Sequence, residues 1–293
     1  MQRKSNRLIV DRALVRSAAW LLLAIAGMPL ASANAALVNR YMLNGDGTDS
    51  VGGANGTLNN PGGTASFSST SLTTTGANGT DFLALPSSVG TGITGDFSIE
   101  DWLTQNGSEG SYNSIFSLST STSNFILLNP NRNGTGTTAD FDQPGVTNGG
   151  AGTEANVNAP GTSFKVGGNF GTELQIVLTY VSSTGVASIY NDGALLASGN
   201  VGSGFSFQTA TAGSFDGIGG GDAFGDPTFN GSTDDFRIYS QALTPSQISA
   251  LDTAGPNASN AQISAAVPEP SSLGAMLGAG TLLCVRRLRR RGA

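Results

Sequence analysis

The chain of 293 residues has 14 basic and 20 acidic side chains, one cysteine and no histidine. The missing histidine excludes Ser-His-Asp and Cys-His catalytic groups, and zinc sites that use histidine ligands. Ten of the basic residues lie before residue 17 or after residue 285, so residues 36–266 keep four basic against 18 acidic side chains, a balance near −14. Such a surface disfavours nucleic acid and anionic membranes, but is compatible with neutral glycans and divalent cations.

Residues 1–35 show the three zones of a secretory signal peptide. A basic start is followed by an apolar run over 18–30 and then by small residues. We predict cleavage after Ala35. An uncleaved membrane anchor is the alternative, but Gly27 and Pro29 interrupt the short apolar run just before the small residues, which favours cleavage.

Short β-rich runs then recur between turn signals, as in an all-β sandwich. This recurrence argues against the disorder that 42 glycines could otherwise indicate. The predicted strands are 36–43, 82–85, 97–103, 114–118, 124–128, 174–181, 185–190, 194–197 and 231–239. Residues 130–161 are rich in Gly, Asn and Thr, and we predict one or more long loops there.

One short helix is predicted over 243–251. Thr244 is its expected N-cap, Pro245 suits the first turn, and Gln247 completes a capping box. The polar and small residues 253–266 are predicted to form a linker.

The C-terminal 27 residues contain a short motif, an apolar stretch over 273–285 and an arginine cluster. The basic end is expected to stay cytoplasmic while the preceding chain is exported, with a short transmembrane helix between them. This tail resembles the PEP-CTERM sorting signal, which implies recognition by an exosortase-type membrane enzyme and a location at the cell envelope or in the extracellular matrix. The residues that match the motif are Pro268, Glu269, Pro270, Arg286, Arg287, Arg289, Arg290 and Arg291.

The segment 36–252 resembles the laminin-G-like, concanavalin A-like jelly-roll domains. The resemblance rests on 37–45, on Phe-Ser-Ile-Glu-Asp-Trp at 97–102, on the hairpin 174–190 and on 229–239. It implies an all-β fold with a two-sheet antiparallel sandwich and one short helix after the last strand, and it implies that Trp102 points into the sandwich. The chain departs from the family in lacking the histidine that usually precedes the central strand.

Calcium is the metal that this composition allows, because any metal must be held by oxygen. Asp46 and Asp49 follow the first predicted strand and could meet Asp234 on the last one. The resemblance supports this site, since many laminin-G-like domains hold one calcium. The alternative is that Asp46 and Asp49 serve their own backbone in Asx turns. A second acidic loop contains Asp222 and Asp226, with the same ambiguity.

No catalytic residue is predicted. Glycoside hydrolysis needs two carboxylates on the same side of the sheet, but Glu100 and Asp101 are adjacent and point to opposite faces. We interpret Glu100 as a structural acid. The aromatic residues that could be exposed for stacking on sugar rings are Tyr112, Phe125, Phe141 and Phe224; burial in the core is the alternative for each.

We therefore predict an exported, non-catalytic surface or matrix protein that binds extracellular polysaccharide or a partner protein through a calcium-stabilised jelly roll. Two alternatives stay open. One is a polysaccharide hydrolase or lyase on the same fold, and the other is a structural matrix protein without a specific ligand.

Overall fold

The computed structural model describes residues 36–77, 79–107, 110–147, 152, 154–160 and 170–268. These residues belong to one compact unit. The predicted signal peptide, its Ala35 cleavage site and the tail from Glu269 onward lie outside the described residues. Pro268, the first residue of the predicted sorting motif, is exposed at the end of the described chain. Within the described residues no helix has the length and apolar content needed to cross a membrane.

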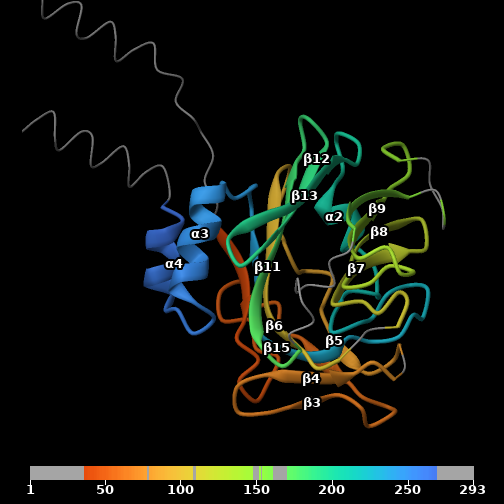
Figure 1. Cartoon of the computed structure of the whole chain (residues 1–293), viewed down its shortest axis with the longest axis vertical. Coiled ribbons are helices and arrows are strands. Elements are labelled where there is room, and N and C mark those ends of the chain that lie inside the picture. Colours follow the sequence, from red (N-terminus) through yellow and green to blue (C-terminus); the bar gives the residue numbers. More distant parts are fainter. Residues whose placement is uncertain are drawn as a thin grey trace, which may run out of the picture. The chain divides into compact units, whose positions relative to one another are not determined.

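The described strands form two antiparallel sheets that pack face to face (Figure 1). The first sheet has eight strands, and β15 pairs with β6 along one side and with β4 and then β1 along the other. Its strands, in spatial order, are β13 (Ala194–Asn200), β12 (Val186–Asn191), β11 (Glu173–Val181), β6 (Phe97–Gln105), β15 (Asn230–Tyr239), β4 (Leu72–Thr75) and β3 (Ser66–Phe67), with β1 (Leu37–Tyr41) beside β15.

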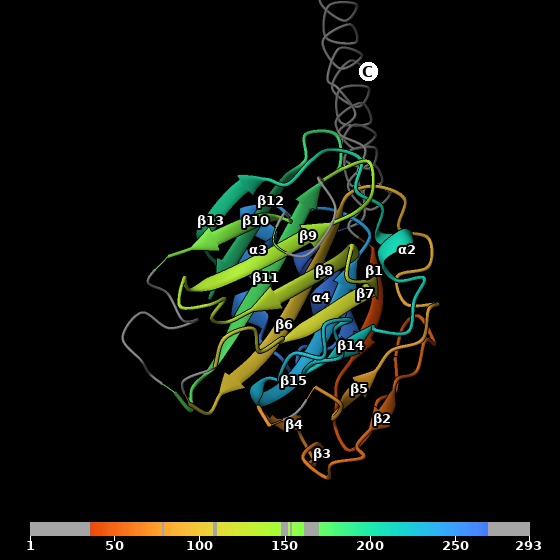
Figure 2. The same cartoon turned by 90° about the vertical axis from the view of Figure 1, so that its right-hand side faces the viewer.

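The second sheet has seven strands among the described residues and is the one that faces the viewer in Figure 2. In spatial order these are β10 (Ala155–Ala159), β9 (Thr137–Asp142), β8 (Asn124–Asn129), β7 (Phe116–Ser121), β14 (Gly217–Ile218), β5 (Phe82–Ala84) and β2 (Thr57–Asn59). The all-β sandwich predicted from the sequence is thus confirmed.

Alternation along each strand places one set of side chains between the sheets. On β6, Phe97, Ile99 and Leu103 belong to the main core, and on β8 Ile126 and Leu128 do. Burying one face of every strand in this way provides most of the driving force for folding.

The prediction of long loops over 130–161 was wrong in part, because β9 and β10 lie within it. Ala139, Phe141 and Val157 point into the core, while Thr138 and Asp140 occupy outer positions. Threonine and aspartate fill the outward positions of β9, and asparagine fills those of β10, so the polar composition concealed both strands.

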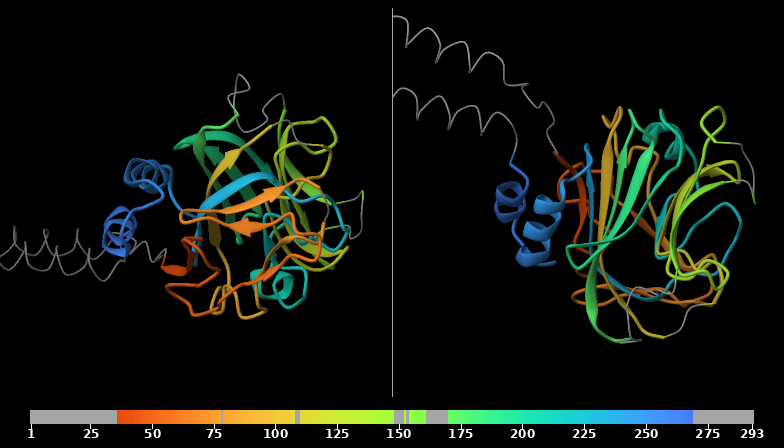
Figure 3. Two further views of the ribbon diagram at one scale, coloured as in Figure 1. Left: turned by 90° about the horizontal axis from the view of Figure 1, so that it is seen from below. Right: turned by 45° about the horizontal axis from the view of Figure 1, so that its top comes forward.

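Helices α3 (Pro245–Ala254) and α4 (Asn260–Ala266) form a third layer on the outer face of the eight-stranded sheet (Figures 1 and 3). The predicted Thr244 cap and its capping box with Gln247 are confirmed. A third helix, α2 (Phe207–Ala210), is a single turn at the edge of the core.

The segment 253–266, predicted as a linker, contains the end of α3 and all of α4. A second capping box, from Ser259 and Gln262, starts α4, and Ile263 and Val267 are buried beneath it. The sequence did contain a signal for α4, namely a Ser-x-x-Gln pattern followed by two apolar residues four positions apart. The small and polar residues around this pattern made it hard to recognise.

A buried ionic network lies between this helical layer and the sheet. Arg237 on β15 donates to Glu100 on β6 (Nη1 to Oε1, 3.1 Å) and to Asp235 (Nη2 to Oδ2, 2.7 Å). Arg40 on β1 also donates to Asp235 (Nη2 to Oδ2, 2.7 Å), and Tyr239 donates its hydroxyl to Glu100 at 2.6 Å. Burial lowers the pKa of Arg237, but the charges of Glu100 and Asp235 outweigh it and raise the pKa above its usual value.

The same two arginines hold the turn between α3 and α4. Arg237 Nη2 donates to the carbonyls of Gly255 (3.0 Å) and Pro256 (2.9 Å), and Arg40 Nη1 donates to Asn260 Oδ1 at 2.7 Å. The helical layer is therefore attached to the sheet through charged donors as well as through apolar contacts.

Glu100 is the buried, hydrogen-bonded structural acid that was predicted, and Asp101 points to the opposite face. Trp102 differs from the expectation. Its Nε1 donates to Glu100 Oε1 at 2.9 Å, so it shares the outer face with Glu100 instead of pointing into the sandwich. Residues two apart on a strand share a face of the sheet. Because Glu100 accepts hydrogen bonds from Arg237 on the outer face, Trp102 lies on the outer face as well.

The network predicts a large cost for removing its central cation. Replacing Arg237 with Met leaves Glu100 and Asp235 buried without that partner, so we expect a loss of about 3–5 kcal/mol in the free energy of unfolding. Urea denaturation measures the difference. Asp252→Asn, which removes the charge of a half-buried acid on α3 that forms none of the described ion pairs, is the control and should not lower stability. Equal stabilities of the two variants would contradict this account.

A second prediction concerns Asp216, which precedes β14. Its Oδ1 accepts from Ser119 N at 2.8 Å, while Oδ2 is buried with no hydrogen-bond partner. Burial raises the pKa of Asp216 from 3.8 to about 8. The unfolded chain then loses this proton first as pH rises, so the contribution of Asp216 to stability is greatest below about pH 4 and declines up to about pH 8.

Urea denaturation at pH 5 and pH 8 should therefore show higher stability at pH 5. Asp216→Asn, which cannot ionise and keeps an oxygen for Ser119 N, should narrow the difference between the two pH values. An unchanged difference in the variant would show that Asp216 does not cause it.

Candidate functional site

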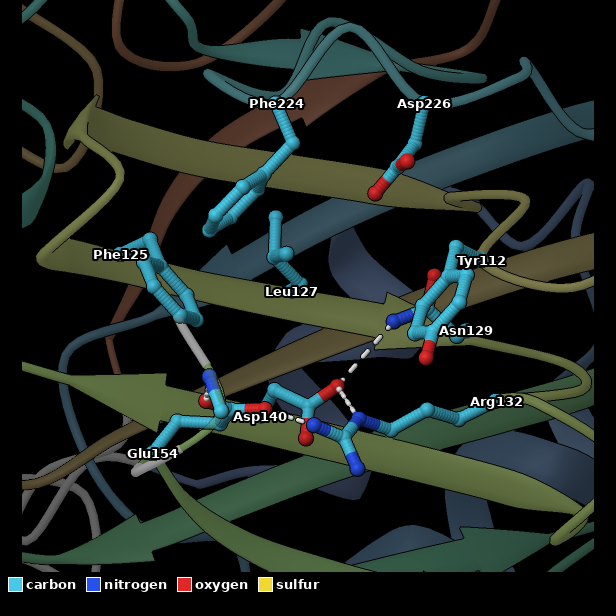
Figure 4. A pocket seen from close by; sticks show the side chains of 10 residues that line it. Tyr112, Phe125, Leu127, Asn129, Arg132, Asp140, Glu154, Phe224 and Asp226 are labelled. Carbon is cyan, nitrogen blue, oxygen red and sulfur yellow. Dashed lines mark hydrogen bonds and ion pairs between the residues drawn. The ribbon is translucent and has the colours of Figure 1, made fainter. Parts of the chain in front are cut away.

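A pocket of about 260 Å³ opens on the outer face of the seven-stranded sheet (Figure 4). Because Ile126 and Leu128 of β8 point into the core, Phe125, Leu127 and Asn129 point outward and form its floor. Phe125 and Leu127 are only 1% and 5% exposed, an unusual degree of burial for the outer face of a sheet. Other side chains must therefore cover them.

The cover is the loop 222–226, which connects β14 to β15. Phe224 packs edge-on against Phe125, with ring centroids 5.3 Å apart and an interplanar angle of 83°. Gly225 has φ = +73°, a left-handed conformation that glycine adopts without strain. The loop thus places an aromatic ring over the pocket and Asp226 beside it (Figure 4).

Asp222 fixes the conformation of this loop. Its Oδ1 accepts from the backbone N–H groups of Phe224 (2.9 Å) and Asp226 (3.1 Å), and its Oδ2 accepts from Ser114 Oγ (2.9 Å). Burial and the negative charge of Asp222 raise the pKa of Asp226 to about 6. Asp222, suspected as a metal ligand, therefore acts here as an anchor for the loop.

The opposite side of the pocket is polar. Arg132 forms ion pairs with Asp140 (Nε to Oδ2, 3.1 Å) and with Glu154, and Asn129 Nδ2 donates to Asp140 Oδ2 at 3.2 Å. Burial raises the pKa of Asp140 to about 6, although the charge of Arg132 opposes the shift. Asp140 Oδ1 is buried without a hydrogen-bond partner.

Tyr112 completes the rim beside Asn129 (Figure 4). Its side chain is 37% exposed, and its backbone has φ = +67°. A tyrosine in the left-handed region costs conformational energy, which the surrounding loop must offset. An exposed ring held in this way is available for contact with a ligand.

Three of the four aromatic residues considered for sugar stacking, Tyr112, Phe125 and Phe224, meet at this pocket. Phe141 is fully buried in the core. The sequence analysis missed Arg132, Asp140 and Glu154. Asp140 lies on β9, in the stretch interpreted as loops, and only the alternation around Ala139 and Phe141 could have assigned it to an outward position.

The residues predicted to bind calcium lie in different local environments. Asp49 is buried, and its two carboxylate oxygens accept hydrogen bonds from five donors of its own loop and the adjacent strand. Asp46 is exposed and accepts from Thr48 N at 2.9 Å, as in an Asx turn. Asp234 lies beside Glu173, whose pKa rises to about 7 because of burial and the negative charge of Asp234.

Among the described residues no three acidic side chains gather as a metal-binding group. The calcium site thus stays a prediction, and the hydrogen bonds of Asp49 indicate instead a structural role in the loop after β1.

Residues 77–249, more than half of the chain, match the laminin-G-type family model described as the concanavalin A-like lectin/glucanases superfamily. The chain belongs to this superfamily. The match begins after β1 to β4, of which β1, β3 and β4 belong to the eight-stranded sheet and β2 to the seven-stranded one. No curated protein matches the chain by sequence.

Among solved structures, domain 4 of AbnA, a GH43 extracellular arabinanase from Geobacillus stearothermophilus in complex with arabinotriose, is similar with a TM-score of 0.55 at 21% identity. That alignment covers 75% of this chain and 100% of the domain. The CBM40 of the Ruminococcus gnavus IT-sialidase, bound to α2,3 sialyllactose, aligns with a TM-score of 0.45 at 15% identity over 62% of this chain and 96% of its own. These likenesses concern the fold.

The hydrogen bonds of Asp49 lead to a prediction that also tests calcium. Asp49→Ala removes the acceptor of five donors, so we expect a loss of at least about 2 kcal/mol in the free energy of unfolding. If Asp49 has only its structural role, the loss is the same with millimolar calcium and with chelator. A calcium-dependent rise in the melting temperature of the natural protein, abolished in Asp234→Asn, would instead support the calcium site.

Proposed function

We propose that this protein is an exported, non-catalytic carbohydrate-binding protein whose jelly roll binds extracellular polysaccharide in the pocket of the seven-stranded sheet. The observation that carries the proposal is the pocket itself. Aromatic rings stand beside hydrogen-bonding side chains in a concave site, which suits a ligand that has both apolar faces and hydroxyl groups.

The size of the pocket favours a small part of a larger ligand. Its volume of about 260 Å³ lies below the usual range for sites that enclose a drug-sized molecule. One sugar ring, either a chain end or a side branch, fits this description. Phe224 and Tyr112 would contact the ring faces, while Asp226 would bind hydroxyl groups.

The family and the structural neighbours support the proposal only in general terms. The superfamily contains lectins as well as glucanases, and the arabinanase domain is in complex with arabinotriose. At 21% identity this likeness does not transfer a ligand. The proposal for this chain therefore depends on its own pocket residues.

A hydrolase is the second candidate, because Asp226 and Asp140 lie on opposite sides of the pocket and both have a pKa raised to about 6. Paired carboxylates in an open site are what glycoside hydrolysis requires. However, Asp140 is 3% exposed and its Oδ2 is bound to Arg132 and Asn129, so it is poorly placed to attack a sugar or a water. The structure thus favours binding over catalysis.

Export and sorting are part of the same proposal and depend on the two ends of the chain. The signal peptide would deliver residues 36–268 across the membrane, and the tail would hold them at the envelope until an exosortase-type enzyme acts. Calcium remains a proposed stabiliser of this domain, with Asp46, Asp49 and Asp234 as the candidate ligands.

A glycan-array screen followed by calorimetry tests carbohydrate binding. We expect Phe224→Ala to weaken binding of any glycan found by about fivefold or more, because an aromatic contact in a binding site is typically worth more than 1 kcal/mol. Phe215→Ala is the matched control, since Phe215 is 40% exposed but does not line the pocket.

The absence of binding to every glycan, with and without calcium, would contradict the proposal and favour a structural matrix protein. Release of reducing sugar from a bound glycan, lost in Asp226→Asn, would instead establish the hydrolase.

A further inference from the structure

The charges around the pocket restrict which sugars it can accept. Among its described lining residues are one cation, Arg132, and three acids, Asp140, Glu154 and Asp226. Arg132 is already ion-paired with both Asp140 and Glu154. The pocket therefore has no free cation among these residues and an excess of negative charge.

Asp226 is the carboxylate with the most freedom to meet a ligand. Its backbone N–H is held by Asp222, which fixes the position of the residue, but none of the identified hydrogen bonds engages its carboxylate. Figure 4 shows this carboxylate extending from the upper loop toward the pocket, across from Asn129. A ligand in the pocket would meet this carboxylate on its upper side.

The buried acceptor of Asp140 adds to this preference for positive charge. Asp140 Oδ1 is enclosed and lacks a partner, and one arginine is shared between this carboxylate and Glu154. The electrostatic potential from the pocket floor is consequently negative despite the presence of Arg132. A negatively charged sugar would have to enter against that potential and against Asp226, with no unpaired donor to compensate.

Resting on the proposed carbohydrate site, we propose that its ligand is a cationic amino sugar, a hexosamine with a free amine. The ammonium group would donate to the carboxylate of Asp226, and the apolar face of the ring would contact Phe224. The whole described domain shares this bias, because its three basic residues, Arg40, Arg132 and Arg237, are all ion-paired. The raised pKa of Asp226 indicates a carboxylate that a positive charge would stabilise in its ionised form.

Calorimetry with three probes tests this inference on the folded domain. The probes are a fully deacetylated β-1,4-glucosamine tetrasaccharide, its N-acetylated counterpart and sialyllactose. A hydrogen bond between charged groups is typically worth more than 1.4 kcal/mol, so we expect the deacetylated probe to bind at least about tenfold more tightly than the N-acetylated one. Sialyllactose should bind most weakly. Added salt should weaken binding of the deacetylated probe more than that of the N-acetylated one.

Two variants assign the effect to the pocket. Asp226→Asn should remove most of the tenfold preference for the amine, because the amide keeps an acceptor for hydroxyl groups but not the negative charge. Phe224→Ala should weaken the binding of both the deacetylated and the N-acetylated probe. Asp252→Asn, which removes an acid on α3 outside the pocket, is the matched charge control and should preserve the preference. Circular dichroism of each variant checks that the domain is folded.

The failures of the two proposals are distinguishable. Equal affinity for the deacetylated and N-acetylated probes, or tighter binding of sialyllactose, would overturn the amino-sugar inference. If Phe224→Ala abolishes the binding seen in that case, carbohydrate binding in the pocket is supported. A preference that persists in Asp226→Asn would also overturn it. Failure of the domain to bind any glycan would overturn both.

Discussion

The guanidinium of Arg237 is completely enclosed, and a buried cation of this kind requires anions and acceptors on every side. It obtains them from Glu100 on the neighbouring strand, from Asp235 on its own strand and from the carbonyls of Gly255 and Pro256. This requirement brings the last strand, the central strand and the C-terminal helices to one point. Arg40 extends the network to the first strand through the same Asp235.

This network helps to determine which sheet has an outer face that is not covered by helices. The outer side of the eight-stranded sheet is covered by α3 and α4, whose apolar residues pack with Tyr239 and Val177 in a second core. The described pocket lies on the other sheet, where no helix of this layer reaches (Figure 3). The ionic network therefore stabilises a layer that closes one face and leaves the opposite one for a ligand.

The described residues include three basic side chains, and each of them is ion-paired with an acid. Arg40 and Arg237 are buried beneath the helices, and Arg132 is held between two acids at the pocket. In a domain with so few basic side chains, the surface has positive regions only where such a side chain lacks an acidic partner. Among the described residues no basic side chain lacks one, so none of their side chains offers an unpaired positive charge to an anion.

The local rules of the sequence identified much of this protein. Hydrophobic alternation and turn residues indicated the sandwich, the Thr244–Gln247 pair indicated α3, and the adjacency of Glu100 and Asp101 placed them on opposite faces. These features depend on neighbours in the chain, so a single sequence contains them. The same reasoning misjudged β9, β10 and α4, because small and polar residues weakened the periodicity on which it depends.

The pocket, in contrast, depends on residues that are far apart in the chain. Phe125, Tyr112 and Phe224 were recognisable as candidate aromatics, but they are up to 112 residues apart in the chain. Whether they meet depends on strand register and on the loop that Asp222 holds over the sheet. Composition alone determined an acidic, histidine-free domain between two predicted targeting segments. Only tertiary structure decided which acids are paired, which are buried and which one faces the pocket, because pairing is a matter of distance in space.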